Sequence, residues 1–280
     1  MSNHPLTLVY HFLTDGSNGI VRQPVEARPY YLDLSIFDRH LAFLAHGRFQ
    51  ALSVTAFLRL FEKDPLGSTN QIIITFDDGH LSNYRLAFPL LKRYDFLATF
   101  YVVPTWVGTE QYMNWKQIRE LANAGMEIGS HTLTHPYLTE LTKEKVRSEF
   151  AQSKQIIEDQ IQQPCHSLAI PYGFNKPEYE QIAKECGYKG VCDSKVSFQS
   201  QFQSTFSRIH RMGVRSHNDV RWLRLLVESK WTTRLKMVLY DRLKNSLKRT
   251  LKLDSWLTLR TGLLTAKYKM RKHIRFSSIG

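Results

Sequence analysis

The sequence is poor in cysteine and lacks both long apolar runs and internal repeats, and each absence excludes a class of protein. Its three cysteines have no close spacing, which argues against a disulfide framework and against a cysteine-based zinc site. No run of about eighteen apolar residues occurs, so we expect no membrane-spanning helix. The first residues carry no basic leader and only a short apolar stretch, which is unlike a secretory signal peptide. We therefore expect a soluble, cytoplasmic chain.

Acidic residues are scarce in one part of the chain only. Residues 221–280 hold sixteen Lys and Arg but three acids, whereas residues 1–220 hold 22 of each sign, so the net charge of +13 lies in the C-terminal part. This shift in composition predicts a boundary, with one domain over residues 1–218 and a basic, amphipathic helical tail over residues 219–280. The first domain is long enough to bury a core of its own.

The predicted tail has cations between tryptophan and leucine residues at near-helical spacing. Basic amphipathic helices commonly lie on anionic membrane surfaces, which would make the chain a peripheral protein at the inner face of the membrane. A helical appendage that packs on the first domain with a solvated charged face explains the pattern equally well. Nucleic-acid binding ranks last, because no nucleic-acid motif accompanies the charge, and we expect no such partner.

Buried strands and amphipathic helices alternate along the first domain. Runs of β-branched and aromatic residues predict strands, and apolar residues at helical spacing predict helices. The predicted strands are residues 6–12, 72–76, 98–103, 126–131, 167–170 and 188–193. The predicted helices are residues 35–45, 54–63, 87–94, 115–124, 142–163 and 177–186. This alternation predicts an α/β fold with parallel strands, most simply a barrel.

The stretch IIITFDDGH, residues 72–80, ends a continuous apolar run on two adjacent carboxylates. A strand that is covered on both faces has such a run, so Asp77 and Asp78 are expected where the strand emerges. In parallel sheets and barrels, sites are usually assembled at the carboxyl ends of the strands. Taken alone, a plain Asp-Asp-Gly turn explains this stretch about as well.

The stretch SHTLTHP, residues 130–136, places two histidines four positions apart. On a wound turn this spacing brings two imidazoles to one side, and Pro136 disfavours helical geometry at His135, so we expect a short turn. Taken alone, two exposed loop histidines explain the stretch more simply. Together with a strand-end aspartate, His131 and His135 make a set of two histidines and one carboxylate, which suits a catalytic metal site with open positions.

These motifs resemble the polysaccharide deacetylase family, whose shared unit is the nodulation-deacetylase homology domain, a distorted seven-stranded (β/α) barrel. The resemblance rests on TFDDG at residues 75–79, SHTLTHP at 130–136 and PYG at 171–173, in the family's order, and it spans about residues 6–215. It implies a hydrolase acting on C–N bonds, a metal-dependent enzyme that removes the acetyl group of an N-acetylated sugar or glycan. A lipid-linked or nascent polysaccharide would fit a tail that meets a membrane.

The resemblance also implies roles for individual residues. Asp77 corresponds to the catalytic base. Asp78, His131 and His135 correspond to the ligands of one divalent ion, for which we expect zinc before cobalt, nickel or iron. The backbone N–H of Tyr172 would stabilise the oxyanion of the tetrahedral intermediate.

Substrate contacts are expected from Pro171, from His11 and from Trp115. The ring of Trp115 would stack on an apolar face of a sugar, although this residue begins a predicted helix and is as readily plain core. Trp106 and Tyr137 are further candidates for such stacking.

The chain departs from the family's pattern in two places. Ala169 stands where many members have the arginine that tunes the catalytic aspartate, so either another cation replaces that arginine or the base is less well poised. The late leucine-x-histidine motif that supplies the general acid is not evident. The candidates for this role are His210, His217, His11 and His80, and we expect His210 not to be the acid. Two alternative functions stay open, a catalytically silent glycan-binding protein and a hydrolase of non-sugar C–N amide bonds.

Overall fold

The fold is described from a computed structural model. It describes residues 5–16, 27–64, 70–195, 197, 202, 206–228, 236, 238 and 239. The predicted tail therefore lies mostly outside the described residues.

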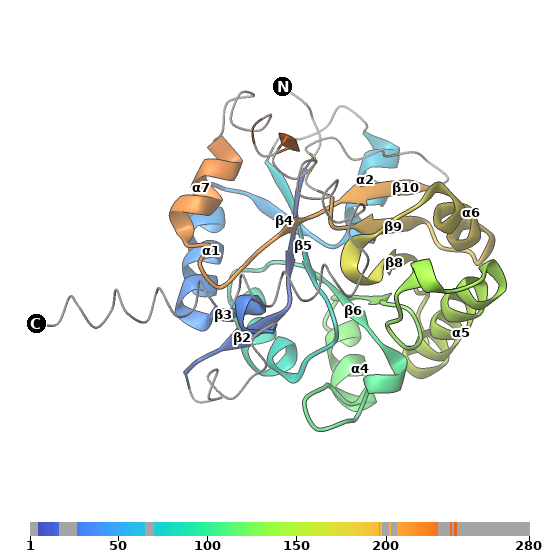
Figure 1. Ribbon diagram of the computed structural model, residues 1–280. Coiled ribbons are helices and arrows are strands. Elements are labelled where there is room, and N and C mark those ends of the chain that lie inside the picture. The colour runs from blue at the N-terminus through green and yellow to red at the C-terminus, as the bar shows by residue number, and fades with distance from the viewer. Residues whose placement is uncertain are drawn as a thin grey trace, which may run out of the picture.

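Parallel strands form a nearly closed barrel with helices around it (Figure 1). The order in the sheet is β10-β9-β8-β7-β6-β5-β1-β11, and every strand pairing of the described residues is parallel. The strands of the barrel are β1 (Leu6–Tyr10), β5 (Gln71–Phe76), β6 (Thr99–Val102), β7 (Glu127–Ser130), β8 (Ser167–Ala169), β9 (Gly190–Asp193), β10 (Ser207–His210) and β11 (Met212–Gly213). The α/β barrel expected from the alternating pattern is confirmed.

The remaining strands are short, and the helices lie on the outside of the barrel. β4 (Gln50–Leu52) adds to β5, and β2 (Phe12–Thr14) pairs with β3 (Tyr31–Asp33) in a separate sheet. The α-helices are α1 (Leu34–His46), α2 (Val54–Lys63), α3 (Phe88–Arg93), α4 (Trp115–Asn123), α5 (Lys143–Ile161), α6 (Pro177–Glu185) and α7 (Val220–Glu228). Side chains at the predicted helix starts accept hydrogen bonds from first-turn amides, as Asn114 and Thr142 do for α4 and α5.

One segment closes the barrel. β10 pairs with β9 at one end of the sheet and β11 pairs with β1 at the other, and a single residue, Arg211, separates these two strands in the chain. β10 and β11 together thus count as one bent strand, which gives the barrel seven strands. Closure places Arg211 between the first and last strands of the sheet.

The amino ends of the strands are closed by α2. The backbone N–H of Val54 donates to Thr99 Oγ1, and the backbone N–H of Thr55 donates to the carboxylate of Glu127, at 2.9 and 2.7 Å. Apolar side chains of α2 join a cluster with one residue from each of five barrel strands, including Ile73. A site is therefore left to the opposite, carboxyl end of the strands, as in other parallel barrels.

The predicted tail begins with helix α7, Val220–Glu228, which packs on α1 (Figure 1). Leu223 and Leu226 are buried there, and Trp222 stacks with His40 at 6.4 Å between ring centroids. α7 therefore packs on the first domain, as the alternative of a helical appendage predicts.

The described residues include no helix long and apolar enough to cross a membrane. The boundary at residue 218 stays a prediction.

Candidate active site

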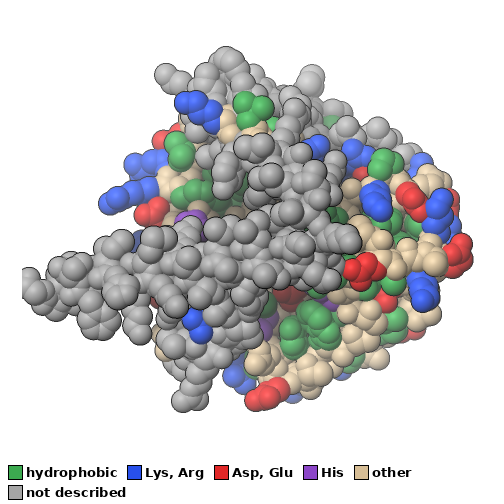
Figure 2. Space-filling view, viewed as in Figure 1, with side chains coloured by type: hydrophobic (Ala, Val, Ile, Leu, Met, Phe, Trp, Pro, Cys, Tyr) green, Lys and Arg blue, Asp and Glu red, His purple; other side chains and the backbone are tan. Residues whose placement is uncertain are grey.

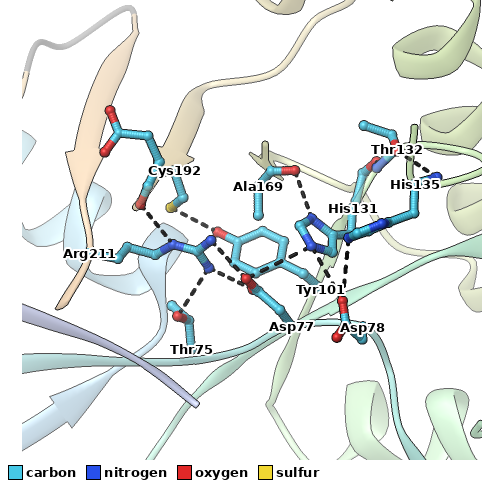
Figure 3. Close-up of polar contacts among 12 residues, drawn as sticks. Thr75, Asp77, Asp78, Tyr101, His131, Thr132, His135, Ala169, Cys192 and Arg211 are labelled. Carbon is cyan, nitrogen blue, oxygen red and sulfur yellow. Dashed lines mark hydrogen bonds and ion pairs between the residues drawn. The ribbon is translucent and has the colours of Figure 1, made fainter. Parts of the chain in front are cut away.

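Asp77 and Asp78 leave the end of β5 in different directions because the chain turns sharply there. Asp78 and Gly79 both have positive φ, 73° and 69°. In Figure 3 the carboxylate of Asp77 faces Arg211, whereas that of Asp78 faces His131. The Asp-Asp-Gly turn expected from the sequence is present, and its effect is to give two neighbouring carboxylates two different environments.

Asp78, His131 and His135 form a cluster whose ligand atoms all lie within 4.8 Å of one another. Asp78 Oδ1 is 3.5 Å from His131 Nε2 and 3.6 Å from His135 Nε2. Metal bonds of about 2.0–2.1 Å in a tetrahedral site imply donor separations of roughly 3.3 Å. The two separations from Asp78 are therefore close to those expected for a single metal ion held among the three donors.

The two imidazoles are oriented by backbone and side-chain contacts. His131 Nδ1 lies 2.9 Å from the carbonyl oxygen of Ala169, so this nitrogen donates and Nε2 is left to act as a ligand. His135 has φ of 60°, and its backbone N–H donates to Thr132 Oγ1 at 3.1 Å. Glu149 of α5 also holds this turn, since it accepts the backbone N–H groups of residues 133 and 134.

Burial sets the protonation states of the three donors. Burial, and then the charge of Asp77, raises the pKa of Asp78 to about 8. Burial, and then His131, lowers the pKa of His135 to about 3, and burial lowers the pKa of His131 too. Neutral imidazoles offer lone pairs, and a buried carboxylate of this kind is stabilised by a cation. The chemistry of the donor set thus fits a divalent ion.

Asp77 forms a buried bidentate ion pair with Arg211. Arg211 Nη1 is 2.6 Å from Asp77 Oδ1, and Nη2 is 2.9 Å from Oδ2. Burial alone would raise the pKa of Asp77, but the Arg211 guanidinium, together with His131 and His11, outweighs this effect and the pKa falls to about 2. Arg211 also donates to Thr75 Oγ1 and to the carbonyl oxygen of Asp193. Another cation therefore replaces the arginine that is absent at Ala169.

Sequence reasoning missed Arg211 because it is 134 residues from its partner, Asp77. The signal that could have found it is the period of two in RIHRMGV, residues 208–214. This period places Arg211 on the same face as Ile209, which belongs to the cluster inside the barrel. An arginine on an inward face requires an acid as its partner.

His11 follows β1 and reaches the same site. Its ring lies 4.5 Å from that of Tyr30, and its Nδ1 atom is buried with no hydrogen-bond partner among the described residues. Burial lowers the pKa of His11 to about 3, with Asp77 acting in the opposite direction and Arg215 and Arg211 in the same direction. The imidazole is therefore neutral at pH 7, and one of its ring nitrogens makes no hydrogen bond among the described residues.

The other three candidates for a general acid have different surroundings. His80 Nδ1 pairs with Ser82 Oγ at 2.8 Å. His210 Nδ1 lies 2.9 Å from Asp193 Oδ1, and His217 is exposed. Of the four candidate histidines, His11 lies close enough to Asp77 for the charge of each to affect the pKa of the other.

Aromatic rings form one edge of the site, the aromatic rim of Trp106, Tyr112, Tyr137 and Tyr172. Tyr172 stacks on Tyr137 with 3.8 Å between ring centroids and 5° between planes, and Trp106 and Tyr172 lie 4.9 and 4.8 Å from His135. Tyr112 is 5.0 Å from Trp106. In Figure 2, histidine and acidic side chains are visible beside a hydrophobic patch near the middle of the face.

The PYG motif supplies Tyr172 to this rim from the 3-10 turn Pro171–Gly173. Tyr172 has φ of 60° and its side chain is 42% exposed, while Pro171 is buried. A Cβ at Gly173 would lie 2.3 Å from the side chain of Ser194, so only glycine fits there. Trp115 is partly buried and packs against the hydrophobic core from α4, as its alternative interpretation as a core residue predicts, and its contact with a sugar stays a prediction. Trp106 lies at the site.

Fold and site together define a class of protein, a (β/α)7 barrel whose strand ends carry two histidines and one aspartate that could hold a metal ion, beside a second aspartate that is paired with an arginine. The family model described as polysaccharide deacetylase matches residues 67–191. YxkH of Bacillus subtilis (strain 168), named for the same family, is 28% identical over 207 residues, which are 74% of this chain and 70% of that protein.

Two further proteins extend the comparison. A peptidoglycan-N-acetylglucosamine deacetylase of Bacillus cereus is 31% identical over 121 residues, 43% of this chain and 54% of that protein. The solved structure of the Streptococcus pyogenes deacetylase PplD in complex with acetate has a TM-score of 0.68 at 23% identity, and the match covers 80% of this chain and 98% of that chain. The chain is thus similar to members of the polysaccharide deacetylase family, and the match to the family model covers residues 67–191.

Proposed function

We propose that this protein is a metal-dependent deacetylase that hydrolyses the N-acetyl group of a sugar or glycan. The observation that carries the proposal is the division between the two carboxylates at the end of β5. Asp78 faces two neutral imidazoles, whereas Asp77 is held by Arg211 outside that donor set. The name of the B. cereus relative, a peptidoglycan-N-acetylglucosamine deacetylase, supports a substrate of this class.

Asp78, His131 and His135 would hold the ion, with zinc expected before cobalt, nickel or iron. When bound, the ion would lower the pKa of a water molecule and polarise the acetamide carbonyl. The hydrogen bond from His131 to the carbonyl of Ala169 keeps Nε2 unprotonated for this purpose.

Asp77 acts as the base. Its pKa of about 2 keeps it anionic at neutral pH, and the two Arg211 contacts leave a further acceptor site on each oxygen. One of these oxygens accepts the proton of the attacking water. The same carboxyl can then return the proton to the leaving nitrogen, because His11 is neutral at pH 7 and does not begin as an acid.

The remaining residues bind and orient the substrate. His11 is partly buried near Asp77, and its side chain would contact the sugar. The backbone N–H of Tyr172, in the turn beside His135, stabilises the developing oxyanion. The aromatic rim offers exposed ring faces to the sugar, above all that of Tyr172.

Acetate release tests the proposal. Wild type and Asp77→Asn, each loaded with zinc or cobalt, are incubated with N-acetylated oligosaccharides, lipid-linked sugars and simple non-sugar amides. We expect release from a glycan that requires metal and is lost in Asp77→Asn. Release from the non-sugar amides alone would replace the proposal with the amide-hydrolase alternative. No release at one metal ion per chain would favour a silent glycan-binding protein, whose main argument, a missing cation, is weakened by Arg211.

A further inference from the structure

Arg215 stands on a rigid turn that follows β11. Its backbone N–H donates to Asn218 Oδ1 at 2.7 Å, and the backbone N–H of Asn218 donates back to the carbonyl of Arg215 at 2.9 Å. The next residue, Ser216, donates its N–H to the carbonyl of Pro29 at 2.8 Å. Asn218 is buried. The position from which the Arg215 side chain projects is thus fixed by three hydrogen bonds.

The guanidinium of Arg215 lies over an aromatic ring that contacts His11 of the active site. Its central carbon is 3.9 Å from the centroid of the Tyr30 ring, and the Tyr30 ring is 4.5 Å from that of His11. The charge of Arg215 acts on His11, as does that of Asp77. Arg215, Tyr30 and His11 therefore form a row of side chains that ends beside the catalytic aspartate.

Arg215 has no acid partner among the described residues, unlike the two arginines of the closing segment before it. Arg211 pairs with Asp77, and Arg208 pairs with Glu180. The nearest acid along the chain, Asp219, accepts the backbone N–H groups of residues 221 and 222 at the start of α7. Stacking occupies the face of the guanidinium and leaves the N–H donors at its edge available to bind a planar or tetrahedral anion.

We infer that Arg215 is a subsite for an anionic group of the glycan substrate, a carboxylate or a phosphate located next to the acetylated sugar. Tyr30 and His11 separate the guanidinium from Asp77, so the anion belongs to a neighbouring part of the substrate and not to the acetamide. A neutral glycan offers no such partner. The inference rests on the proposed function, because it assumes that a glycan occupies the site.

Binding of three matched probes tests the subsite. The probes are neutral tri-N-acetylchitotriose, its 1-phosphate, and a tetrasaccharide that alternates N-acetylglucosamine with N-acetylmuramic acid and so carries carboxylates. Dissociation constants are measured by calorimetry on the full, zinc-loaded chain at one ionic strength, for wild type, Arg215→Gln and Arg215→Lys. The control is Arg224→Gln, which removes an exposed cation of α7 that pairs with Glu228. Acetate release is recorded in the same samples.

We expect wild type to bind one anionic probe about tenfold tighter than the neutral one, since a charge-assisted pair of this kind contributes about 1.4 kcal/mol or more. Arg215→Gln should lose this preference and bind the neutral probe as before, and Arg215→Lys should keep part of it. The probe that loses affinity identifies the phosphate or the carboxylate. Equal binding of all three probes by wild type, or a preference that survives in Arg215→Gln, would overturn the inference. Absence of acetate release would count against the proposed function only.

Discussion

At the scale of the residue, the site depends on how one turn gives two adjacent aspartates opposite properties. Asp78 is partly buried beside Asp77 and has no Lys or Arg in direct contact among the described residues, and its pKa is raised to about 8. Asp77 is buried, but Arg211, together with His131 and His11, lowers its pKa to about 2. A carboxyl group with a raised pKa and a carboxylate that is ionised at neutral pH thus lie side by side.

Removal of Arg211 should impair both stability and activity. The folded-state pKa of Asp77 lies below its ordinary value of 3.8, so the ion pair stabilises the fold above pH 4 and loses this effect as pH falls toward 2. In Arg211→Gln an unpaired carboxylate stays buried, which should cost about 3–5 kcal/mol of unfolding free energy at pH 7. Urea unfolding at pH 7 measures this loss, and a cost near zero would contradict the assigned ion pair.

The same variant should shift the pH dependence of catalysis. Without Arg211, burial raises the pKa of Asp77, so the acid limb of the kcat/KM profile should move to higher pH. Arg211→Lys, which keeps a charge but not the bidentate geometry, should show a smaller shift. An unchanged acid limb in Arg211→Gln would mean that Asp77 is not the group that limits the rate at low pH.

At the scale of the element, regular segments could be predicted from the sequence and the closing segment could not. The buried run of β5 and the helical spacing of α4 and α5 are strong local signals, and these elements were predicted within a few residues. β4 and the β2–β3 pair have three residues per strand, too few for a periodic pattern. The pairing of Arg211 with Asp77 depends on barrel closure, which no local pattern reports.

The turn that carries His131 and His135 depends on α5 through Glu149. Glu149→Ala removes the acceptor of the N–H groups of residues 133 and 134 and of the Thr134 hydroxyl. Loss of such support around metal ligands typically lowers metal affinity 10–100-fold, and we expect a zinc dissociation constant weakened by that factor. Competition with a chelator measures it. Glu144→Ala, on the exposed first turn of the same helix, should bind zinc as wild type does, and equal affinities in the two variants would refute the role of Glu149.

At the scale of the whole molecule, the surplus of positive charge and the residues of the candidate active site lie in different parts of the chain. The surplus of thirteen positive charges follows residue 220, whereas the barrel carries the site. α7 belongs to the barrel through Leu223 and Leu226. We propose that the sequence beyond it holds the protein on an anionic membrane surface at the cytoplasmic side, where lipid-linked glycans would be within reach.

A truncation that ends after Glu228 tests this proposal and leaves α7 in place. The full chain should sediment with vesicles that contain phosphatidylserine or phosphatidylglycerol, and the truncated chain should stay in the supernatant. Vesicles of phosphatidylcholine alone should bind neither chain, because the attraction is electrostatic. Equal sedimentation of the full and truncated chains with anionic vesicles would rule out the tail as the attachment.

The division of roles between Asp77 and Asp78 is the central claim, and metal content measured together with acetate release tests it most directly. Each aspartate is replaced by asparagine, and both variants are dialysed against zinc. We predict that Asp77→Asn retains about one zinc ion per chain but releases no acetate, whereas Asp78→Asn loses the zinc and the activity together. Loss of zinc in Asp77→Asn, or full zinc content in Asp78→Asn, would contradict the assignment of base and ligand.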